Sequence, residues 1–383
     1  MRRVCALLLS FWILGTLPRS TFAAPLEVGG KSSFLMDVTT GTVLHEANAH
    51  ESLAPASVTK VMTMLLIMEA IDSGKITWDD TVTTSEAAAA KGGSQVYLKV
   101  GETMTVTDML KSIAVSSAND CACAMAEHIA GSETAFVELM NSRAKELGMN
   151  DSHFVNCTGL DDSEEAKNHR TSAHDIAVMS RQLLKNHPEI RKFTTIWMDS
   201  VRDGAFGLSN TNKLVRFYDG ATGLKTGFTS GAGYCLSASA MRDGMELIAV
   251  VMGAENSKER FNTCKSLLDH GFANYALFQP DLTETGSIPV KLGKTSLVSP
   301  ILGEQASLLV DKTQKSNITT DVVLEEILTA PVSRGQRLGT LTVRSEGEIL
   351  KEIPLVAGES VDRLTFRDLF LTVLKQAAMA KQV

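Results

Sequence analysis

The chain has 383 residues, of which 44% are hydrophobic and 21% are charged, and it carries a formal net charge of -7. A chain of this length and composition can bury a substantial core and is expected to form two domains, which excludes a disordered protein. Its acidic balance excludes the usual nucleic-acid-binding protein, whose surface is basic. We therefore expect no nucleic acid among its partners.

The N-terminus predicts export from the cytoplasm. Arg2 and Arg3 precede an apolar run over residues 4–17, and small residues follow up to Ala23. This pattern is typical of a secretory signal peptide over residues 1–23. The alternative, an uncleaved membrane anchor, needs about 20 apolar residues, and this run is shorter. Cleavage would move the net charge from -7 to -10, because three arginines and no acid are removed. The mature protein would then lie outside the cytoplasmic membrane, in a periplasm or a cell wall.

Five cysteines remain after that cleavage, which is an odd number. Cys121 and Cys123 lie two residues apart on a predicted helix and so point away from each other. We expect free, mostly buried thiols, and the alternative is a disulfide framework. No spacing of cysteine or histidine indicates a metal site, so no metal and no cofactor are expected. The five residues are Cys121, Cys123, Cys157, Cys235 and Cys264.

The first predicted elements are a hairpin and a buried helix. Residues 33–44 indicate a strand, a Thr-Thr-Gly turn and a second strand. From Ser57 the chain is apolar nearly all round a helical wheel, which is typical of a helix buried on every side. The following region, residues 84–185, is expected to be largely helical. Its clearest helices cover residues 108–113, 120–130, 132–147 and 173–185.

Two further strands are expected at residues 234–240 and 246–252, joined by the turn Arg242-Asp-Gly244. Sheet at both ends of a helical middle predicts an α/β (α+β) domain in which terminal strands pair around a helical insertion. We place this domain at residues 24–280.

The C-terminal part predicts a small β domain and a terminal helix. Short alternating runs such as residues 340–344 and 349–356, punctuated by glycine and proline, place the β domain at residues 284–358. Residues 361–383 form an amphipathic pattern with a net charge of +2, which suits the surface of an anionic membrane. The alternative is a helix that packs on the β domain or on a second subunit.

Three short motifs point to acyl transfer. In the first, Ser57-Val-Thr-Lys60, the serine lies at the start of the buried helix and the lysine follows one turn later. A serine hydroxyl becomes a good nucleophile only when a base takes its proton. Lysine can be that base if burial and a neighbouring positive charge lower its pKa from about 10.4 toward neutrality. Alone, this motif also fits an ordinary helix N-cap.

The other two motifs are Ser117-Ala-Asn119 and Lys225-Thr-Gly227. The first falls between two predicted helices, where a hydroxyl and an amide can face a substrate, and its alternative is a capping turn. In the second, Lys225 could supply the charge near Lys60 and Gly227 would leave room for a substrate backbone. Its alternative is a surface turn. In this order, the three motifs match the S-x-x-K, S-x-N and K-T-G pattern of enzymes that form an acyl ester on serine.

With these motifs the chain resembles the low-molecular-mass penicillin-binding proteins that act as serine-type D-alanyl-D-alanine carboxypeptidases. The likeness runs from about residue 25 to the C-terminus. It implies a penicillin-binding, β-lactamase-like transpeptidase fold with helices clustered on an antiparallel sheet, a small C-terminal β domain and an amphipathic helix that attaches to the membrane. The passages that carry it are Ala54-Pro-Ala-Ser-Val-Thr-Lys60, Val115-Ser-Ser-Ala-Asn-Asp120, Thr158-Gly-Leu-Asp-Asp162 with His169 to Asp175, and Gly220-Ala-Thr-Gly-Leu-Lys-Thr-Gly227.

The resemblance also implies a role for each residue of the reacting centre. Ser57 would be acylated, and Lys60 would take its proton. Ser117 would relay a proton to the leaving D-alanine, and Asn119 would hold the acyl amide. The backbone N–H groups of Ser57 and Phe228 would bind the oxyanion.

Three further residues would bind the substrate's terminal carboxylate. Lys225 would attract it while lowering the pKa of Lys60, and Thr226 would donate a hydrogen bond to it. Arg260 would be a second positive charge for the same group, and the alternative is a solvated charge on a helix.

The expected substrate is a peptidoglycan stem pentapeptide ending in D-Ala-D-Ala, and β-lactam antibiotics are the expected covalent inhibitors. A DD-transpeptidase would use the same residues, because only the acyl acceptor differs. A β-lactamase is less favoured, because its candidate glutamate, Glu164, lies in a stretch that aligns better with carboxypeptidases. A catalytically silent wall-binding scaffold is a further alternative, and the intact motifs argue against it. His169 and His174 are expected to have structural roles, because a base is already present.

Overall fold

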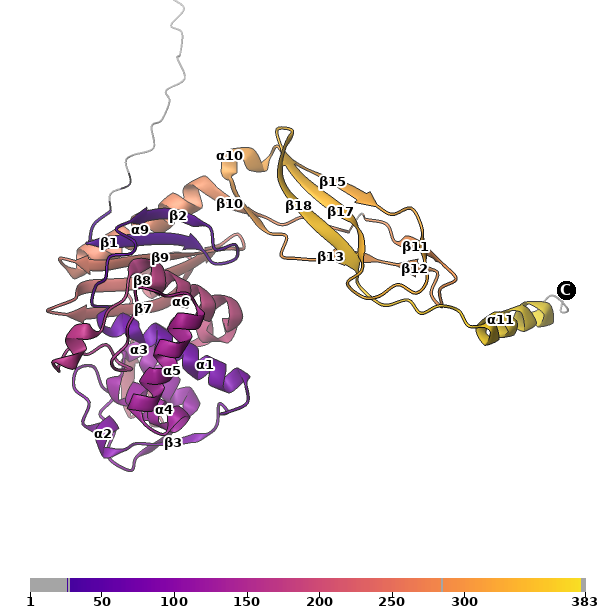
Figure 1. The fold of residues 1–383 in the computed structure, drawn as a ribbon. Helices are drawn as coiled ribbons and strands as arrows, with labels where there is room; N and C mark the ends of the chain where they lie inside the picture. Colours follow the sequence, from indigo (N-terminus) through magenta and orange to yellow (C-terminus); the bar gives the residue numbers. More distant parts are fainter. Residues whose placement is uncertain (1–25, 27, 284, 380–383) are drawn as a thin grey trace, which may run out of the picture.

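The computed structural model describes residue 26, residues 28–283 and residues 285–379. The predicted signal peptide, residues 1–23, lies outside this part. The described chain is elongated: a mixed helix-and-sheet domain is followed by a β domain, and one helix lies at the far C-terminal end (Figure 1). This arrangement confirms the predicted α/β (α+β) fold with a small C-terminal all-β domain.

A sheet of antiparallel strands forms the centre of the first domain. Its strands are β1 (Ser32–Asp37), β2 (Val43–Ala47), β7 (Ala221–Thr229), β8 (Gly233–Arg242) and β9 (Met245–Ala254). Their spatial order is β2-β1-β9-β8-β7, so the predicted N-terminal hairpin pairs with the later strands through β1 and β9. β8 and β9 are buried over most of their length because helices cover both faces of the sheet.

Helix α1 (Lys60–Asp72) is the central helix that the sequence predicts, and 10 of its 13 residues are buried. It packs with other helices against the inner face of the sheet and forms the largest core. Helix α9 (Ser257–Asn274) covers the opposite face, where a second core lies. The remaining long helices agree with the predicted ones: α3 (Val106–Ser116), α4 (Asn119–Ala130), α5 (Glu133–Glu146) and α6 (Ala173–Asn186).

Short elements connect these parts of the first domain. They are the 3-10 helices η1 (Ala56–Thr59), η2 (Glu165–Asn168) and η3 (Pro188–Ile190), the helices α2 (Glu86–Ala89), α7 (Arg191–Thr194) and α8 (Leu214–Phe217), and the strands β3 (Thr81–Thr83), β4 (Thr103–Thr105), β5 (Met198–Val201) and β6 (Phe206–Ser209). The five predicted thiols are all free and buried, as expected.

The β domain consists of small sheets over its own two cores. Its elements are β10 (Tyr275–Phe278), β11 (Ile288–Lys291), β12 (Leu297–Val298), β13 (Pro300–Leu302), β14 (Leu308–Asp311), α10 (Lys312–Lys315), β15 (Ile318–Leu324), β16 (Leu328–Thr329), β17 (Arg337–Ser345) and β18 (Glu348–Ala357). β10 follows α9 directly and pairs with β14. Gln305 also donates a 2.8 Å hydrogen bond to the carbonyl of Thr39, so contacts join the two domains.

The terminal helix α11 (Phe366–Met379) begins at Phe366 and not at residue 361. The predicted start is wrong because Val361 pairs with Val332 and is buried in the β domain. The described apolar side chains of α11 are 43–84% exposed, which argues against packing on the β domain. They are Phe366, Leu369, Phe370, Leu371, Val373 and Leu374. Among the described residues, no helix combines the length and apolarity needed to cross a bilayer.

Because α1 is buried, substitutions in it should lower the stability of the protein. Leu65 is 0% exposed, so Leu65→Ala should lower the free energy of unfolding by about 2–5 kcal/mol. The matched control is Leu139→Ala on α5, whose leucine is 41% exposed, and its effect should stay within about 0.5 kcal/mol. Denaturant unfolding measures both, and equal losses would contradict the central position of α1.

Candidate active site

Ser57 and Lys60 lie at the junction of η1 and α1, where the sequence places them. Ser57 is half-buried in η1, and Lys60 is the first residue of α1. Lys60 Nζ lies 3.1 Å from Ser57 Oγ and donates a 2.8 Å hydrogen bond to the carbonyl oxygen of Thr158. The amine is therefore within proton-transfer distance of the hydroxyl.

Burial sets the protonation state of Lys60. The side chain is 0% exposed, and burial lowers the pKa of its amine to about 7. Cys157 and Asp120 act in the opposite direction, but the cost of burying a charge outweighs them. A substantial fraction of the amine is therefore neutral at neutral pH and can accept a proton.

Lys225 is a second buried amine, on β7. It is 0% exposed, and its pKa lies well below the usual range because of burial and then repulsion by Lys60 and Arg260. Its Nζ donates a 3.0 Å hydrogen bond to the carbonyl of Thr226. The fold thus brings Lys225 into electrostatic contact with Lys60, although burial is the main cause of the low pKa at both positions.

Ser117 and Asn119 join α3 to α4, as the sequence predicts. Ser117 caps α3 in the left-handed region, with φ 63°, and is 3% exposed. Asn119 begins α4, and its Nδ2 donates a 2.7 Å hydrogen bond to the carbonyl of Gly92. Ser117 Oγ and Asn119 Oδ1 are buried without a hydrogen-bond partner among the described residues. Buried polar atoms normally have partners, so both atoms are candidates for contact with a ligand.

Asp120 supports this turn, and sequence reasoning did not assign it a role. Its buried carboxylate accepts hydrogen bonds from the backbone N–H groups of Val96 and Leu98, at 3.1 and 3.0 Å. The N–H of Asn119 donates to the carbonyl of Ser94 at 2.7 Å. These bonds fix residues 92–98 beside the turn. The only sequence signal was that Asp120 follows the motif directly.

β7 is an edge strand, so one row of its backbone groups is not paired with another strand of the sheet. On it, Thr226 Oγ1 donates a 2.7 Å hydrogen bond to Thr211 Oγ1. Phe228 is 53% exposed, and its ring packs on Tyr234 with the ring centroids 4.3 Å apart. Thr211 could not be identified from the sequence, because it lies in no motif.

Gly227 has a packing role that the sequence does not predict. A side chain at this position would come within 2.6 Å of the carbonyl oxygen of Pro55 and 3.0 Å of the N–H nitrogen of Val58. The space is occupied by η1 and its preceding residue, so the glycine lets β7 approach the serine turn closely. It does not leave that space for a substrate.

Arg260 is buried, at 7% exposed, which rules out the solvated-charge alternative. Its guanidinium donates to the carbonyls of Gly227 and Cys235, at 2.9 and 3.2 Å, and lies over the ring of Tyr234. Its Nε has no partner among the described residues. Arg260 therefore supports β7 from α9, next to the residues of the third motif.

The remaining candidates lie outside the reacting centre. His169 is buried, and its two ring nitrogens contact Thr59 Oγ1 and the N–H of Val155. Burial lowers its pKa to about 3, so it is a neutral ring in a structural position. Glu164, the glutamate of the β-lactamase alternative, forms an exposed ion pair with Lys167.

Comparison with known proteins decides the family. The D-alanyl-D-alanine carboxypeptidase family matches residues 19–256, and the C-terminal domain of penicillin-binding protein 5 matches residues 272–363. The chain belongs to the D-alanyl-D-alanine carboxypeptidase family. The resemblance inferred from the motifs is thereby confirmed.

Individual relatives cover between 65% and 98% of this chain. The D-alanyl-D-alanine carboxypeptidase DacF of Bacillus subtilis is 43% identical, with 98% of each chain covered. Penicillin-binding protein 5 from Haemophilus influenzae has a TM-score of 0.72 and 30% identity, covering 89% of this chain and 100% of that one. The ampicillin-bound penicillin-binding protein D2 from Listeria monocytogenes has a TM-score of 0.59 and 31% identity, covering 65% of this chain and 100% of that one.

The packing at Gly227 can be tested with a matched pair of glycines. Gly227→Ala should force β7 away from η1, lower stability by about 1–3 kcal/mol and slow acylation at least tenfold. The control is Gly231→Ala, where the nearest atom to an added Cβ is 3.4 Å away. Thermal unfolding and labelling with a fluorescent penicillin measure the two effects. Equal behaviour of the two variants would contradict the close-approach explanation.

Proposed function

We propose that the protein is a serine-type D-alanyl-D-alanine carboxypeptidase that removes the terminal D-alanine from peptidoglycan stem pentapeptides through an acyl ester on Ser57. The observation that carries the proposal is the buried Lys60 amine, with a pKa of about 7, lying 3.1 Å from the Ser57 hydroxyl. Because the chain belongs to the D-alanyl-D-alanine carboxypeptidase family, the bond that we expect it to hydrolyse is the one between two D-alanines.

Acylation begins when the neutral amine of Lys60 takes the proton of Ser57, and the Ser57 oxygen attacks the carbonyl carbon of the penultimate D-alanine. The backbone N–H groups of Ser57 and Phe228 stabilise the oxyanion that forms. The C–N bond then breaks, and the departing nitrogen receives the proton through Ser117. Free D-alanine leaves, and an ester on Ser57 remains.

Deacylation uses the same groups with water as the nucleophile. The Lys60 amine, neutral again after D-alanine has left, takes one proton from water as the water oxygen attacks the ester carbonyl. Lys60 then returns that proton to Ser57, which leaves as the alcohol. Asn119 holds the acyl amide through both halves of the reaction, which suits the unpaired Oδ1 of its side chain. A β-lactam acylates the same serine and is released slowly.

Substrate recognition rests on the positive charge around β7. In the free protein the pKa of Lys225 is lowered first by burial and then by Lys60 and Arg260. A substrate carboxylate beside it would raise that pKa again, because an opposite charge favours the ammonium form. Lys225 would therefore become charged as substrate binds, and Arg260 would add to the local positive potential. The Thr226 hydroxyl would turn its hydrogen from Thr211 to the carboxylate.

One experiment separates this function from its rivals. Purified protein is incubated with a pentapeptide ending in D-Ala-D-Ala, and separately with a labelled penicillin. We expect release of D-alanine and a long-lived label that is lost in Ser57→Ala. Transfer of the acyl peptide to an added amine in place of water would favour a transpeptidase. Penicillin labelling without any release of D-alanine would favour a silent scaffold. Hydrolysis of penicillin within seconds would favour a β-lactamase.

The pKa of Lys60 predicts the pH dependence of acylation. Below about pH 7 the amine is protonated and cannot accept the Ser57 proton, whereas above pH 7 it is neutral. The kcat/KM for a soluble peptide should therefore rise with pH, with a half-maximum near pH 7. Lys60→Ala should lower it by about 10²–10⁴-fold. A flat profile between pH 5.5 and about 8.5 would contradict the role of Lys60 as base.

The export and membrane attachment of the protein are part of the proposal. The predicted signal peptide would take it across the cytoplasmic membrane, and α11 would lie on the outer face of that membrane. The exposed apolar side chains of α11 support this, because they match the buried face of an interfacial helix.

Truncation before Phe366 tests the attachment. Because Val361 is buried in the β domain, the cut spares residues 361–365. We expect the truncated protein to lose binding to anionic lipid vesicles while its activity on a soluble peptide stays within about twofold of the full chain. Vesicle sedimentation and D-alanine release measure the two properties, and retained vesicle binding would contradict the role of α11.

A further inference from the structure

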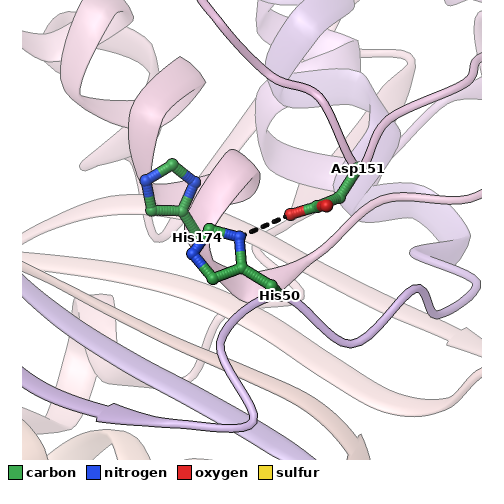
Figure 2. Close-up of side chains that lie close together, drawn as sticks. All are labelled: His50, Asp151 and His174. Carbon is green, nitrogen blue, oxygen red and sulfur yellow. Dashed lines mark hydrogen bonds and ion pairs between the residues drawn. The ribbon is translucent and has the colours of Figure 1, made fainter.

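Two histidines and one aspartate meet on the surface of the first domain, outside the residues assigned to acyl transfer. His50 follows β2, Asp151 lies in the loop after α5, and His174 lies in the first turn of α6 (Figure 2). Each residue offers one ligand atom, and these atoms all lie within 4.8 Å of one another. Three separate segments of the chain therefore bring together imidazole and carboxylate groups, which are common metal ligands.

The three side chains are already held close together. His50 Nδ1 lies 2.7 Å from Asp151 Oδ2, as the dashed line in Figure 2 shows. The rings of His50 and His174 face each other with their centroids 4.5 Å apart. Ser172 Oγ donates a 2.9 Å hydrogen bond to the same oxygen of Asp151. Two contacts to one oxygen thus hold the Asp151 carboxylate in place.

A second carboxylate orients His174. His174 Nδ1 lies 2.9 Å from Asp175 Oδ1, and Asp175 is itself 1% exposed. The other oxygen of Asp175 accepts from the N–H of Asp151 and from Ser152 Oγ, at 2.9 and 2.8 Å. These hydrogen bonds hold the His174 ring and the Asp151 loop in a fixed arrangement.

We propose that His50, Asp151 and His174 form a Zn²⁺ site with two nitrogen ligands, one oxygen ligand and water at the remaining position. Ligands about 2.1 Å from tetrahedral zinc lie about 3.4 Å apart. His50 Nδ1 and Asp151 Oδ2, now 2.7 Å apart, must therefore separate slightly, while any wider pair within the 4.8 Å limit must close. His50 can supply that movement, because its side chain is 63% exposed. The hydrogen bond between His50 and Asp151 would be replaced by bonds to the metal.

The position of the site indicates a structural role. Zinc would join the segment that leads from β2 toward η1 to the loop after α5 and to the start of α6. The same region is crossed by the isolated bridge between Leu53 and Thr171. Binding to the folded chain alone would stabilise it in proportion to zinc concentration, without being needed for acyl transfer.

Zinc titration of the purified protein, prepared without a polyhistidine tag and stripped with a chelator, tests the site. Calorimetry should show one Zn²⁺ per chain, and saturating zinc should raise the Tm by about 5 °C. His50→Ala and His174→Ala should each weaken binding at least tenfold. The matched control is His128→Ala, an exposed histidine on α4, which should bind zinc as the unaltered protein does.

Co²⁺ provides a second readout that does not depend on stability. Its visible absorption should indicate four-coordinate metal in the unaltered protein and in the His128→Ala variant, and this signal should be lost with His50→Ala. Zinc affinity that is the same in all the variants, or no binding at millimolar zinc, would overturn the proposal. None of these measurements uses the carboxypeptidase activity, so they stand apart from the test of Ser57.

Discussion

The burial of the Lys60 amine beside Ser57 is the interaction on which the rest of the site depends. A lysine in a helix that is apolar nearly all round can be buried at moderate cost only as the neutral amine. The low pKa is thus a consequence of packing α1 into the centre of the domain. The carbonyl of Thr158 satisfies one hydrogen of that amine and directs it toward the serine. Burial and proton transfer therefore favour the same protonation state of Lys60, because the neutral amine costs less free energy to bury than the ammonium and is also the form that accepts a proton.

Backbone packing holds the serine in place. Ala56 precedes Ser57 with a positive φ of 48°, and its carbonyl lies against Gly159, where a side chain would come within 1.9 Å. Gly227 lets β7 approach from the other side. Two glycines from distant parts of the sequence therefore allow backbone segments to close around Ser57. Any side chain at either position would push one of those segments away.

The three motifs could be predicted because each combines residue types that chemistry restricts. The central hairpin, the buried α1 and the helices around it could also be predicted, since their apolar patterns are long and regular. A partner that acts through its backbone has no such signal, which is why the Thr158 carbonyl was missed. Asp120 and Thr211 support the site through hydrogen bonds to residues far away in the sequence, and a single sequence does not reveal such contacts. The start of α11 was misplaced because Val361 fits a helical pattern as well as a β-domain core.

The central claim is that Lys60 is neutral near physiological pH because it is buried. Its titration can be followed directly by NMR in protein with isotope-labelled lysine, with the Lys60 signal assigned by its absence from a Lys60→Arg variant. The midpoint should lie near pH 7, far below that of the exposed lysines. A Lys60 midpoint close to the ordinary lysine value of about 10.4 would contradict the account.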